Sequence, residues 1–536
     1  MSPFARIASA VLVGSMLFTA ACDQGSRSKN KLVIGLDSEV ERLDPLTIKN
    51  PKTFIVSWQI YQGLLGLDSS GSIAPAIAES WSTSDNKTWR FKIREGVYFH
   101  PSPLFGDGSK GRVVTTADVA ASYTAFCGAT AYPAFLLTDI VAGCADYNAG
   151  KASSVSGFRA IDDRTFEVEL LKPEPFFPNR LTTAWIAVFP SEALDARFKD
   201  KWGLSLAVGT GPFRMVSSND SEIRLARAPA YWDKAKAGGF EELDFQIVKN
   251  DTARLGALQK GTIDIMPAPT ALYPTIFSDG GVLKPDYANT IASLKYLTFN
   301  SHMLGFNVTK LQDVNLRRAI SHGIDRTRIV DTLFYGYAKV NGGAIPFGMN
   351  GYSPTVPADK LYNLETARAE LAKSNYSGEE IELLVHDQAG SEQIGELIQS
   401  QLKQIGISIR LTKTDFNSAI GRMVKGDVPM FSMYFDYVFS APELILLNMF
   451  DSAKRPVPNF WQFSDADVDA RLEGLHSLPR AAALRDSAGI ESAIVDQAPA
   501  AFLFQFTPVV LYRKNLPAPA INAHGCFDFA AMRTSP

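Results

Sequence analysis

The sequence predicts a multidomain α/β protein. Its 536 residues exceed what one hydrophobic core usually serves, and domains of about 150 residues would give roughly two to four of them. Residues 381–411 read as strand, helix and strand, a βαβ unit whose strands are parallel and whose crossover is right-handed. Residues 89–94 alternate apolar and basic side chains, which is typical of a strand with one buried face.

Composition and charge limit the kind of partner. Hydrophobic residues make up 46% of the chain and charged residues 20%, as in an ordinary globular protein. The formal net charge is −3, whereas proteins that bind nucleic acid or an anionic membrane surface usually carry a basic excess. We therefore expect a small solute or another protein as the partner, and no nucleic acid.

The N-terminal residues read as an export signal followed by a tether. Arg6 supplies a positive charge, and residues 7–18 form an apolar stretch shorter than the roughly 20 residues that span a bilayer. The sequence Thr-Ala-Ala-Cys that ends at Cys22 resembles a lipobox; the alternative is an ordinary signal peptide cleaved nearby. We predict a signal peptide over residues 1–21 and a polar, lipidated tether over 22–31. Several acyl chains on Cys22 would anchor the protein stably to a membrane. No later segment is long and apolar enough to cross a membrane.

The stretch from Ile73 to Tyr123 combines a turn, a strand, a loop and the start of a helix, which Thr115 or Thr116 can cap. It contains in order I-A-P-x-I-A-E-S-W, S-x-D-x-K-T-W-x-F-x-I-R-E-G-V-x-F-H and T-x-A-D-V. In these motifs the chain resembles the extracellular solute-binding proteins of family 5, the peptide/nickel-type receptors of bacterial ABC importers. Weaker similarity continues almost to the C-terminus, for example in NLRRAISHGIDRTRIV at residues 315–330.

The resemblance implies a two-lobe periplasmic-binding-protein fold with an extra subdomain inserted in the first lobe. We assign residues 32–75, 190–290 and 505–536 to lobe I, residues 76–189 to the inserted subdomain and residues 291–504 to lobe II. The alternating segment Thr165–Leu170 should pair with the strand at residues 89–94. We expect the apolar strand Ala501–Phe506 to return to the first lobe.

Three cysteines follow Cys22. In an oxidising compartment we expect Cys127 and Cys144 to form a disulfide that closes a short loop. Cys526 is then left over, and it stays an alternative partner for either of the other two.

No motif supports catalysis or metal binding. Residues 106–111 match G-x-G-x-x-G, but Pro101 and Pro103 precede them and Val113-Val114 separates them from the next helix, so an ordinary loop is expected. The chain contains no HExxH, paired CxxC or G-x-S-x-G, and its six histidines are scattered. His100 reads as a hydrogen-bonded structural histidine. We predict no enzyme, no catalytic residue, no cofactor and no metal site.

The most informative segment for binding is Pro429–Phe450, where Asp436 lies among aromatic residues. An acidic group in such surroundings can hold a cation, and the alternative is a capping or salt-bridged aspartate. The family carries W-x-x-D-Y-x-x-P here, and in its peptide receptors the aspartate holds the α-ammonium group of the ligand. Asp436 matches that position, while Met433 replaces the tryptophan and Pro442 lies two residues further on. The predicted ligand contacts are Asp436, Tyr437, Met433, Tyr434 and Phe439, together with Glu39 and Val40, which match a family stretch that lines the ligand.

The resemblance implies a monomeric periplasmic receptor, held at a membrane by its N-terminal lipid. It would capture an oligopeptide-like solute by hinge closure and deliver it to a membrane permease. A bound carboxylate would be held by backbone amides or by an arginine that the sequence does not identify. The alternatives are a receptor for a more apolar non-peptide solute, a tethered sensor without a transport role and, last, a periplasmic enzyme.

Overall fold

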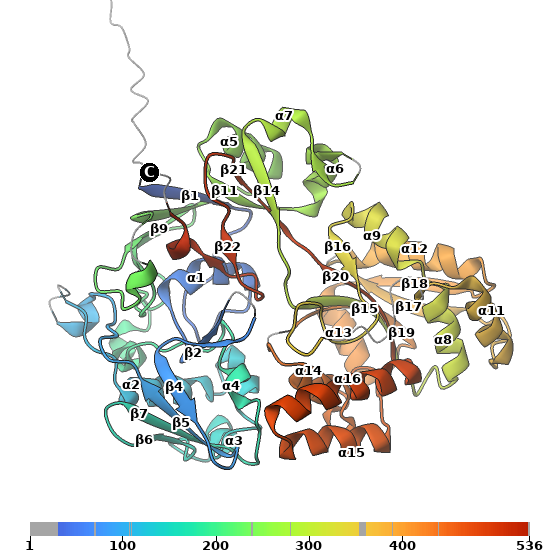
Figure 1. The fold of residues 1–536 in the computed structure, drawn as a ribbon, viewed down its shortest axis with the longest axis horizontal. Helices are drawn as coiled ribbons and strands as arrows, with labels where there is room; N and C mark the ends of the chain where they lie inside the picture. Colours follow the sequence, from blue (N-terminus) through green and yellow to red (C-terminus); the bar gives the residue numbers. More distant parts are fainter. Residues whose placement is uncertain are drawn as a thin grey trace, which may run out of the picture.

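The computed structural model describes residues 30–68, 71–106, 108, 110–236, 239–278, 280–352, 361–388, 390–437 and 439–533. The predicted signal peptide, Cys22 and the tether up to residue 29 lie outside these residues. Two lobes lie side by side, and the chain links them in the middle of the molecule (Figure 1). Among the described residues, no helix has both the length and the apolar character that a membrane span requires.

The first lobe is built on a seven-stranded mixed sheet. Its order is β14-β21-β11-β1-β10-β9-β8, and it contains the N-terminal strand, which is parallel to β10 and β11. The strands are β1 (Lys31–Leu36), β8 (Phe213–Ser218), β9 (Glu222–Arg227), β10 (Glu242–Ile247), β11 (Ile265–Ala268), β14 (Ile291–Lys295) and β21 (Val509–Arg513). The helices of this lobe are α1 (Phe54–Ile60), α5 (Asp251–Lys260), α6 (Tyr273–Ile276) and α7 (Pro285–Ala288). Three short strand pairs accompany them: β2 (Leu65–Leu67) with β3 (Ile73–Pro75), β12 (Phe277–Ser278) with β13 (Val282–Leu283), and β22 (Ala520–Ile521) with β23 (Phe527–Asp528).

A separate four-stranded sheet, of order β4-β5-β7-β6, lies in the region predicted as the inserted subdomain. The predicted pairing of the strands around residues 89–94 and 165–170 is confirmed, with Phe91 opposite Phe166. The next helix is capped as predicted, since the Thr115 and Asp118 side chains form a capping box. The elements of this part are β4 (Ala78–Ser82), β5 (Thr88–Ile93), β6 (Phe158–Ala160), β7 (Thr165–Glu169), α2 (Thr116–Phe126), α3 (Cys144–Asn148) and α4 (Phe177–Arg180).

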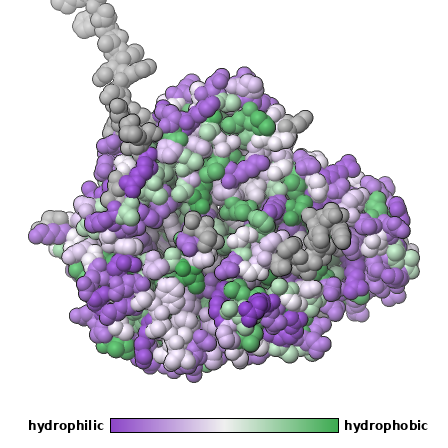
Figure 2. Space-filling model, in the orientation of Figure 1, coloured by the Kyte–Doolittle hydropathy of each residue, from purple (hydrophilic) through white to green (hydrophobic). Residues whose placement is uncertain are grey.

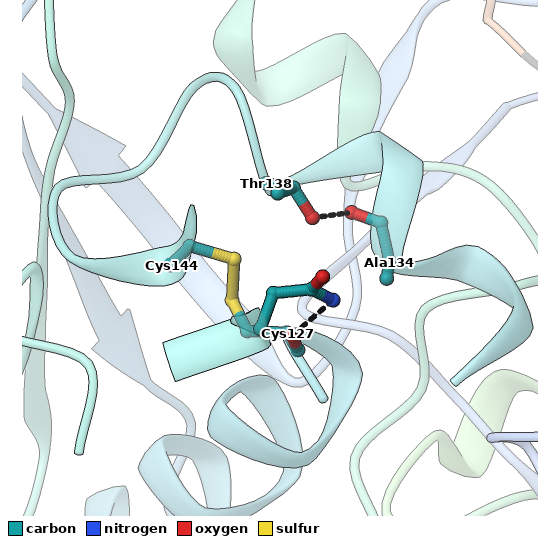
Figure 3. The surroundings of a disulfide bond; sticks show 5 residues. Cys127, Ala134, Thr138 and Cys144 are labelled. Atoms are coloured by element: carbon teal, nitrogen blue, oxygen red, sulfur yellow. Dashed lines mark hydrogen bonds between the residues drawn. A yellow bond between two sulfur atoms is a disulfide. The ribbon is translucent and has the colours of Figure 1, made fainter. Parts of the chain in front are cut away.

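A disulfide joins the end of α2 to the start of α3, as Figure 3 shows. It links Cys127 to Cys144, as predicted, and Cys526 is a free, buried cysteine. Two hydrogen bonds fix the enclosed loop and its exit: Thr138 Oγ1 donates to the Ala134 carbonyl at 2.6 Å, and Asn148 Nδ2 donates to the Cys127 carbonyl at 2.9 Å. The cross-link therefore closes a loop that is already ordered by its own hydrogen bonds.

We predict that the double variant Cys127→Ser/Cys144→Ser loses about 3 kcal/mol of unfolding free energy, because a cross-link over a short loop restricts the unfolded chain by about that amount. Chemical denaturation measures the change. The control is Cys526→Ala, which removes a thiol but no cross-link. A double variant as stable as the parent would contradict a stabilising role for the disulfide.

The second lobe is built on a six-stranded sheet of order β16-β20-β15-β19-β17-β18. The predicted βαβ unit is confirmed, because β17 and β18 are parallel with Ile381 opposite Ile409 and α12 connects them. The strands are β15 (Asn300–Phe306), β16 (Ala338–Val340), β17 (Ile381–His386), β18 (Ile409–Thr414), β19 (Met430–Asp436) and β20 (Ala500–Phe506).

Helices cover both faces of this sheet (Figure 1). Buried side chains of α8, α9, α11 and α12 pack with alternate residues of the central strands, including Leu304 and Met430. Side chains of α13, α14, α15 and α16 pack on the opposite face with Met303 and Met433. The helices are α8 (Val314–Gly323), α9 (Arg326–Phe334), α11 (Leu364–Lys373), α12 (Ser391–Lys403), α13 (Phe416–Lys425), α14 (Pro442–Phe450), α15 (Ala466–Gly474) and α16 (Arg480–Gln497).

The structure corrects the expected crossings between the lobes. The strand expected to return to the first lobe, Ala501–Phe506, belongs to β20 and pairs with β15 and β16 in the second lobe. The return is made by β21, which pairs with β11 and β14. Likewise, residues 291–295 form β14 in the first sheet, so the chain enters the second sheet only at Asn300. The predicted boundary at residue 291 is therefore too early, and that at residue 505 falls within β20.

The two lobes also touch away from these crossings. The Asn179 side chain, in α4, donates to the Ser440 carbonyl at 3.1 Å, and the His476 ring lies within hydrogen-bond distance of the Pro173 carbonyl. An exposed ion pair, Lys172 with Glu473, lies on the same side. The lobes therefore meet through the inserted sheet region as well as through the connecting segments.

Candidate functional site

A cavity of about 730 Å³ lies between the two lobes, which is a usual size for a small-molecule site. The first lobe contributes the segment around α6, and the second contributes the end of α9, the start of α12 and the ends of β15, β19 and β20. Hydrophobic residues gather near the middle of the face seen in Figure 2. The cavity is lined by Ala268, Thr270, Ala271, Tyr273, Pro274, Asn300, Thr332, Leu333, Phe334, Tyr335, Tyr337, Gly390, Gln393, Tyr434, Phe506 and Pro508.

The position of the cavity follows from the chain path. The two connecting segments, residues 296–299 and 507–508, are too short to separate the sheets, so the ends of β15 and β20 stay close to the first lobe. Helix α9 ends in a left-handed residue, Tyr335, with φ of 52°. This cap turns the chain, and it leaves the side chains on either side of it on the cavity wall.

Asp436 and Tyr434 point to the same face of β19, because they are two residues apart in a strand. The Tyr434 hydroxyl donates a hydrogen bond of 2.5 Å to Asp436 Oδ1. Tyr434 lines the cavity, and so does Asn300, the cross-strand partner of Asp436. The predicted anchor therefore lies beside the cavity.

The Asp436 carboxylate has no cationic partner among the described residues. Its side chain reaches solvent, but much protein surrounds it. The resulting loss of water raises the pKa of this carboxyl, and the hydrogen bond from Tyr434 opposes that effect. An accessible carboxylate in a partly dehydrated place is suited to pair with a cation that arrives with a ligand.

The structure separates the other predicted contacts from this pair. Met433 lies on the opposite face of β19 and is 4% exposed, and Tyr437, which directly follows the strand, is 7% exposed. Phe439 is 8% exposed, and the Arg180 guanidinium lies over its ring at 5.1 Å from the centroid. These three side chains belong to the core and do not line the cavity. Strand alternation accounts for Met433 and, one residue past the end of β19, for Tyr437, whereas Phe439 lies outside the strand.

Glu39 and Val40 follow β1 in the first lobe, and neither lines the cavity. Glu39 forms an exposed ion pair of 2.7 Å with Lys249, and Val40 is half-buried against the core. The carboxylate of Glu39 is therefore already paired, in contrast to that of Asp436.

Much of the cavity wall was not anticipated from the sequence. Five aromatic side chains besides Tyr434 line it: Tyr273, Phe334, Tyr335, Tyr337 and Phe506. The run Phe-Tyr-Gly-Tyr at residues 334–337 was a usable signal, since aromatic residues directly after a helix end can lie in the gap between two lobes.

His100 has the predicted structural role. It is 3% exposed, its Nε2 donates to the Gly211 carbonyl at 2.9 Å, and its Nδ1 accepts from the Gly209 amide. Burial lowers its pKa to about 4, so the ring is neutral. Among the described residues, no three His, Cys, Asp or Glu side chains are grouped as a metal site would need. The glycine-rich motif lies in a loop before α2, with Asp107 and Ser109 outside the described residues.

Two α/β lobes with a cavity between them define the class of two-lobe periplasmic binding proteins. Within this class, residues 72–456 match the bacterial extracellular solute-binding proteins, family 5, middle region, and this is more than half of the chain. The protein belongs to that family.

The similarity extends to characterised proteins and solved structures. The chain is 28% identical to the periplasmic oligopeptide-binding protein OppA of Salmonella typhimurium, over 66% of this chain and 62% of that protein, which is less than two thirds of its length. It is 26% identical to the oligopeptide-binding protein OppA of Bacillus subtilis, over 75% of this chain and 74% of that one. The structure of HbpA2 from Haemophilus parasuis has the same fold, with a TM-score of 0.79, 22% identity and coverage of 94% of this chain and 99% of that one.

Proposed function

We propose that this protein is the solute-binding component of an ABC importer and that it captures a peptide-like solute with a free amino group. The observation that carries the proposal is the Asp436 carboxylate beside the inter-lobe cavity, which accepts a hydrogen bond from Tyr434 but has no cationic partner among the described residues. Membership of the family and the oligopeptide-binding relatives support the transport role. In this proposal Asp436 pairs with the ligand ammonium, and Tyr434 orients the carboxylate.

Binding would be coupled to a change in the angle between the lobes. Only the short segments 296–299 and 507–508 connect the two main sheets, so rotation about them would enclose the solute. The enclosed form would then dock on the permease subunits. No covalent chemistry is proposed, and the protein would act as a monomer and not as an enzyme.

The proposed location is the periplasm, with the protein anchored to a membrane through acylated Cys22. The lipobox-like sequence before Cys22 supports this proposal. Mass spectrometry of the mature protein tests it: a lipid-modified N-terminal cysteine is expected, and an unmodified chain cleaved at another site would contradict it.

A direct binding experiment tests the amine anchor. The purified protein is offered a pool of tripeptides X-Phe-X, with X any residue, and the same pool acetylated at the N-terminus, and the captured peptides are quantified by mass spectrometry. The free-amine pool should be captured at least about tenfold better, since a lost charge-assisted contact costs at least about 1.4 kcal/mol. Equal capture of both pools would contradict the proposal, and would favour a non-peptide apolar solute for this aromatic cavity.

The hydrogen bond from Tyr434 gives a prediction about pH. Tyr434→Phe removes a bond that lowers the pKa of Asp436, so that pKa should rise further. Because only the ionised carboxylate pairs with an ammonium, affinity should be lost at a higher pH in the variant than in the parent as the solution is acidified. Isothermal titration over a pH series measures the shift. Tyr362→Phe, an exposed tyrosine away from the cavity wall, is the control, and identical profiles for Tyr434→Phe and the parent would refute the prediction.

A further inference from the structure

The described part of the wall of the inter-lobe cavity carries no ionisable acidic or basic side chain other than its tyrosines. Among the described residues that line it, none is Lys, Arg, His, Asp or Glu. The polar groups on the wall are hydroxyls and amides, from Thr270, Thr332, Asn300, Gln393 and the tyrosines. These described residues therefore offer hydrogen bonds and apolar surface, and none of them offers a counter-ion for a buried anion.

Burial of an anion without a counter-ion is costly. A carboxylate removed from water loses several kcal/mol of hydration, which only a close cation and full hydrogen bonding restore. The charge beside this cavity has the wrong sign for that purpose, since Asp436 is itself an anion with no cationic partner among the described residues. An ammonium group is favoured beside Asp436, because the negative carboxylate attracts its positive charge.

The aromatic side chains point to the chemistry of the rest of the ligand. Tyr273 comes from the first lobe, whereas Phe334 and Phe506 come from the second. Rings from both lobes can cover an apolar or aromatic group, and their faces also tolerate a cation. A solute with an amine at one end and an apolar body would satisfy all of these groups.

Lys295 is a cation that lies close to the wall without lining it. Lys295, the last residue of β14, holds its Nζ 4.1 Å from the centroid of the Tyr337 ring. The Lys295 side chain is exposed and is absent from the residues that line the cavity. Its effect on ligand choice can be measured separately.

We infer that the solute presents a cationic amine and an apolar or aromatic body to this cavity, and that it places no anionic group inside. This inference rests on the proposed function and narrows the substrate class. For a peptide, the terminal carboxylate stays in water or is absent, as in an amidated or otherwise uncharged C-terminus. Free dicarboxylic or acidic peptides are disfavoured.

The test compares the X-Phe-X tripeptide pool as free acids with the same pool as C-terminal amides, in competition for the purified protein. Captured peptides are quantified by mass spectrometry. The amides should be captured at least as well as the acids. A preference for the acids of tenfold or more would overturn the inference while leaving the proposed function intact, whereas failure to capture either pool would contradict both.

Variants make the same test sharper. Gln393→Arg places a cation on the wall and should shift capture toward the free acids by about tenfold, as a new charge-assisted contact of about 1.4 kcal/mol would. The matched variant Gln393→Met should leave the ratio of acids to amides unchanged. Lys295→Met should leave it unchanged too, and a loss of acid binding in that variant would show that Lys295 already serves as the counter-ion and would overturn the inference.

Discussion

Asp436→Asn should weaken the binding of peptides with a free amino terminus by about 100-fold, or about 3 kcal/mol. The substitution keeps the shape and the bond from Tyr434, but it removes the negative charge that would pair with the ammonium. The effect is large because closure of the lobes would exclude water from the pair, and a charge left unpaired in such a place is costly. Isothermal titration with tripeptides taken from the captured pool measures the change.

The control for this variant is Glu380→Gln. Glu380 forms an exposed ion pair with Arg410 in the second lobe, and neither residue lines the cavity. Glu380→Gln removes the same amount of charge as Asp436→Asn and should change the affinity for peptides less than about twofold, because exposed ion pairs contribute little. Asp436→Asn with the affinity of the parent would show that the ligand is held elsewhere.

The second large effect is expected on stability, from a buried ion pair near the contact between the lobes. Arg180 Nε donates to Glu174 Oε1 at 2.6 Å, and the two side chains are 6% and 3% exposed. The Arg180 guanidinium also lies over Phe439. Glu174→Gln leaves a buried guanidinium without its carboxylate, so we expect a loss of about 3–5 kcal/mol in unfolding free energy.

A surface pair on the same side of the molecule provides the matched control. Lys172 and Glu473 form an ion pair of 3.0 Å, with side chains 53% and 67% exposed. Glu473→Gln should cost no more than about 1 kcal/mol, because water solvates both charges once the pair is lost. Urea denaturation of both variants measures the difference, and equal destabilisation would contradict the distinction between the buried pair and the exposed one.

Local features of the fold were predictable where a pattern has one physical reading. Alternation identified β5 and its partner β7, and the change of period from two to 3.6 identified the unit from β17 to β18. The capping of α2 and the disulfide followed from residue types at short range. Each of these patterns lies within a short stretch of sequence, although the pairing of β5 with β7 joins strands that are far apart in the chain.

The partners of the terminal strand could not be read from the sequence. Residues 500–506 are apolar on both faces, which predicts a central strand but not the sheet that contains it. Their partners in β15 are about 200 residues away in the chain. Only the folded structure shows that the chain re-enters the sheet of the first lobe at Val509.

The candidate site was predictable in part. Asp436 was found by resemblance and by its aromatic neighbours, and the structure places it beside the cavity. Strand alternation could have predicted which neighbours of Asp436 point away from the cavity, since Met433 and Tyr437 are an odd number of residues away from it. The residues of the cavity wall could not be predicted, because several segments distant in the sequence form the wall together.

The most direct test of the proposed capture is mass spectrometry of the solutes that co-purify with the protein begun at Asp23, repeated with Asp436→Ala. We expect a set of molecules that share a free amine and an apolar body, retained by the parent protein and lost from the variant. A species without an amine, retained equally by both proteins, would contradict the role of Asp436 and with it the proposed mode of binding.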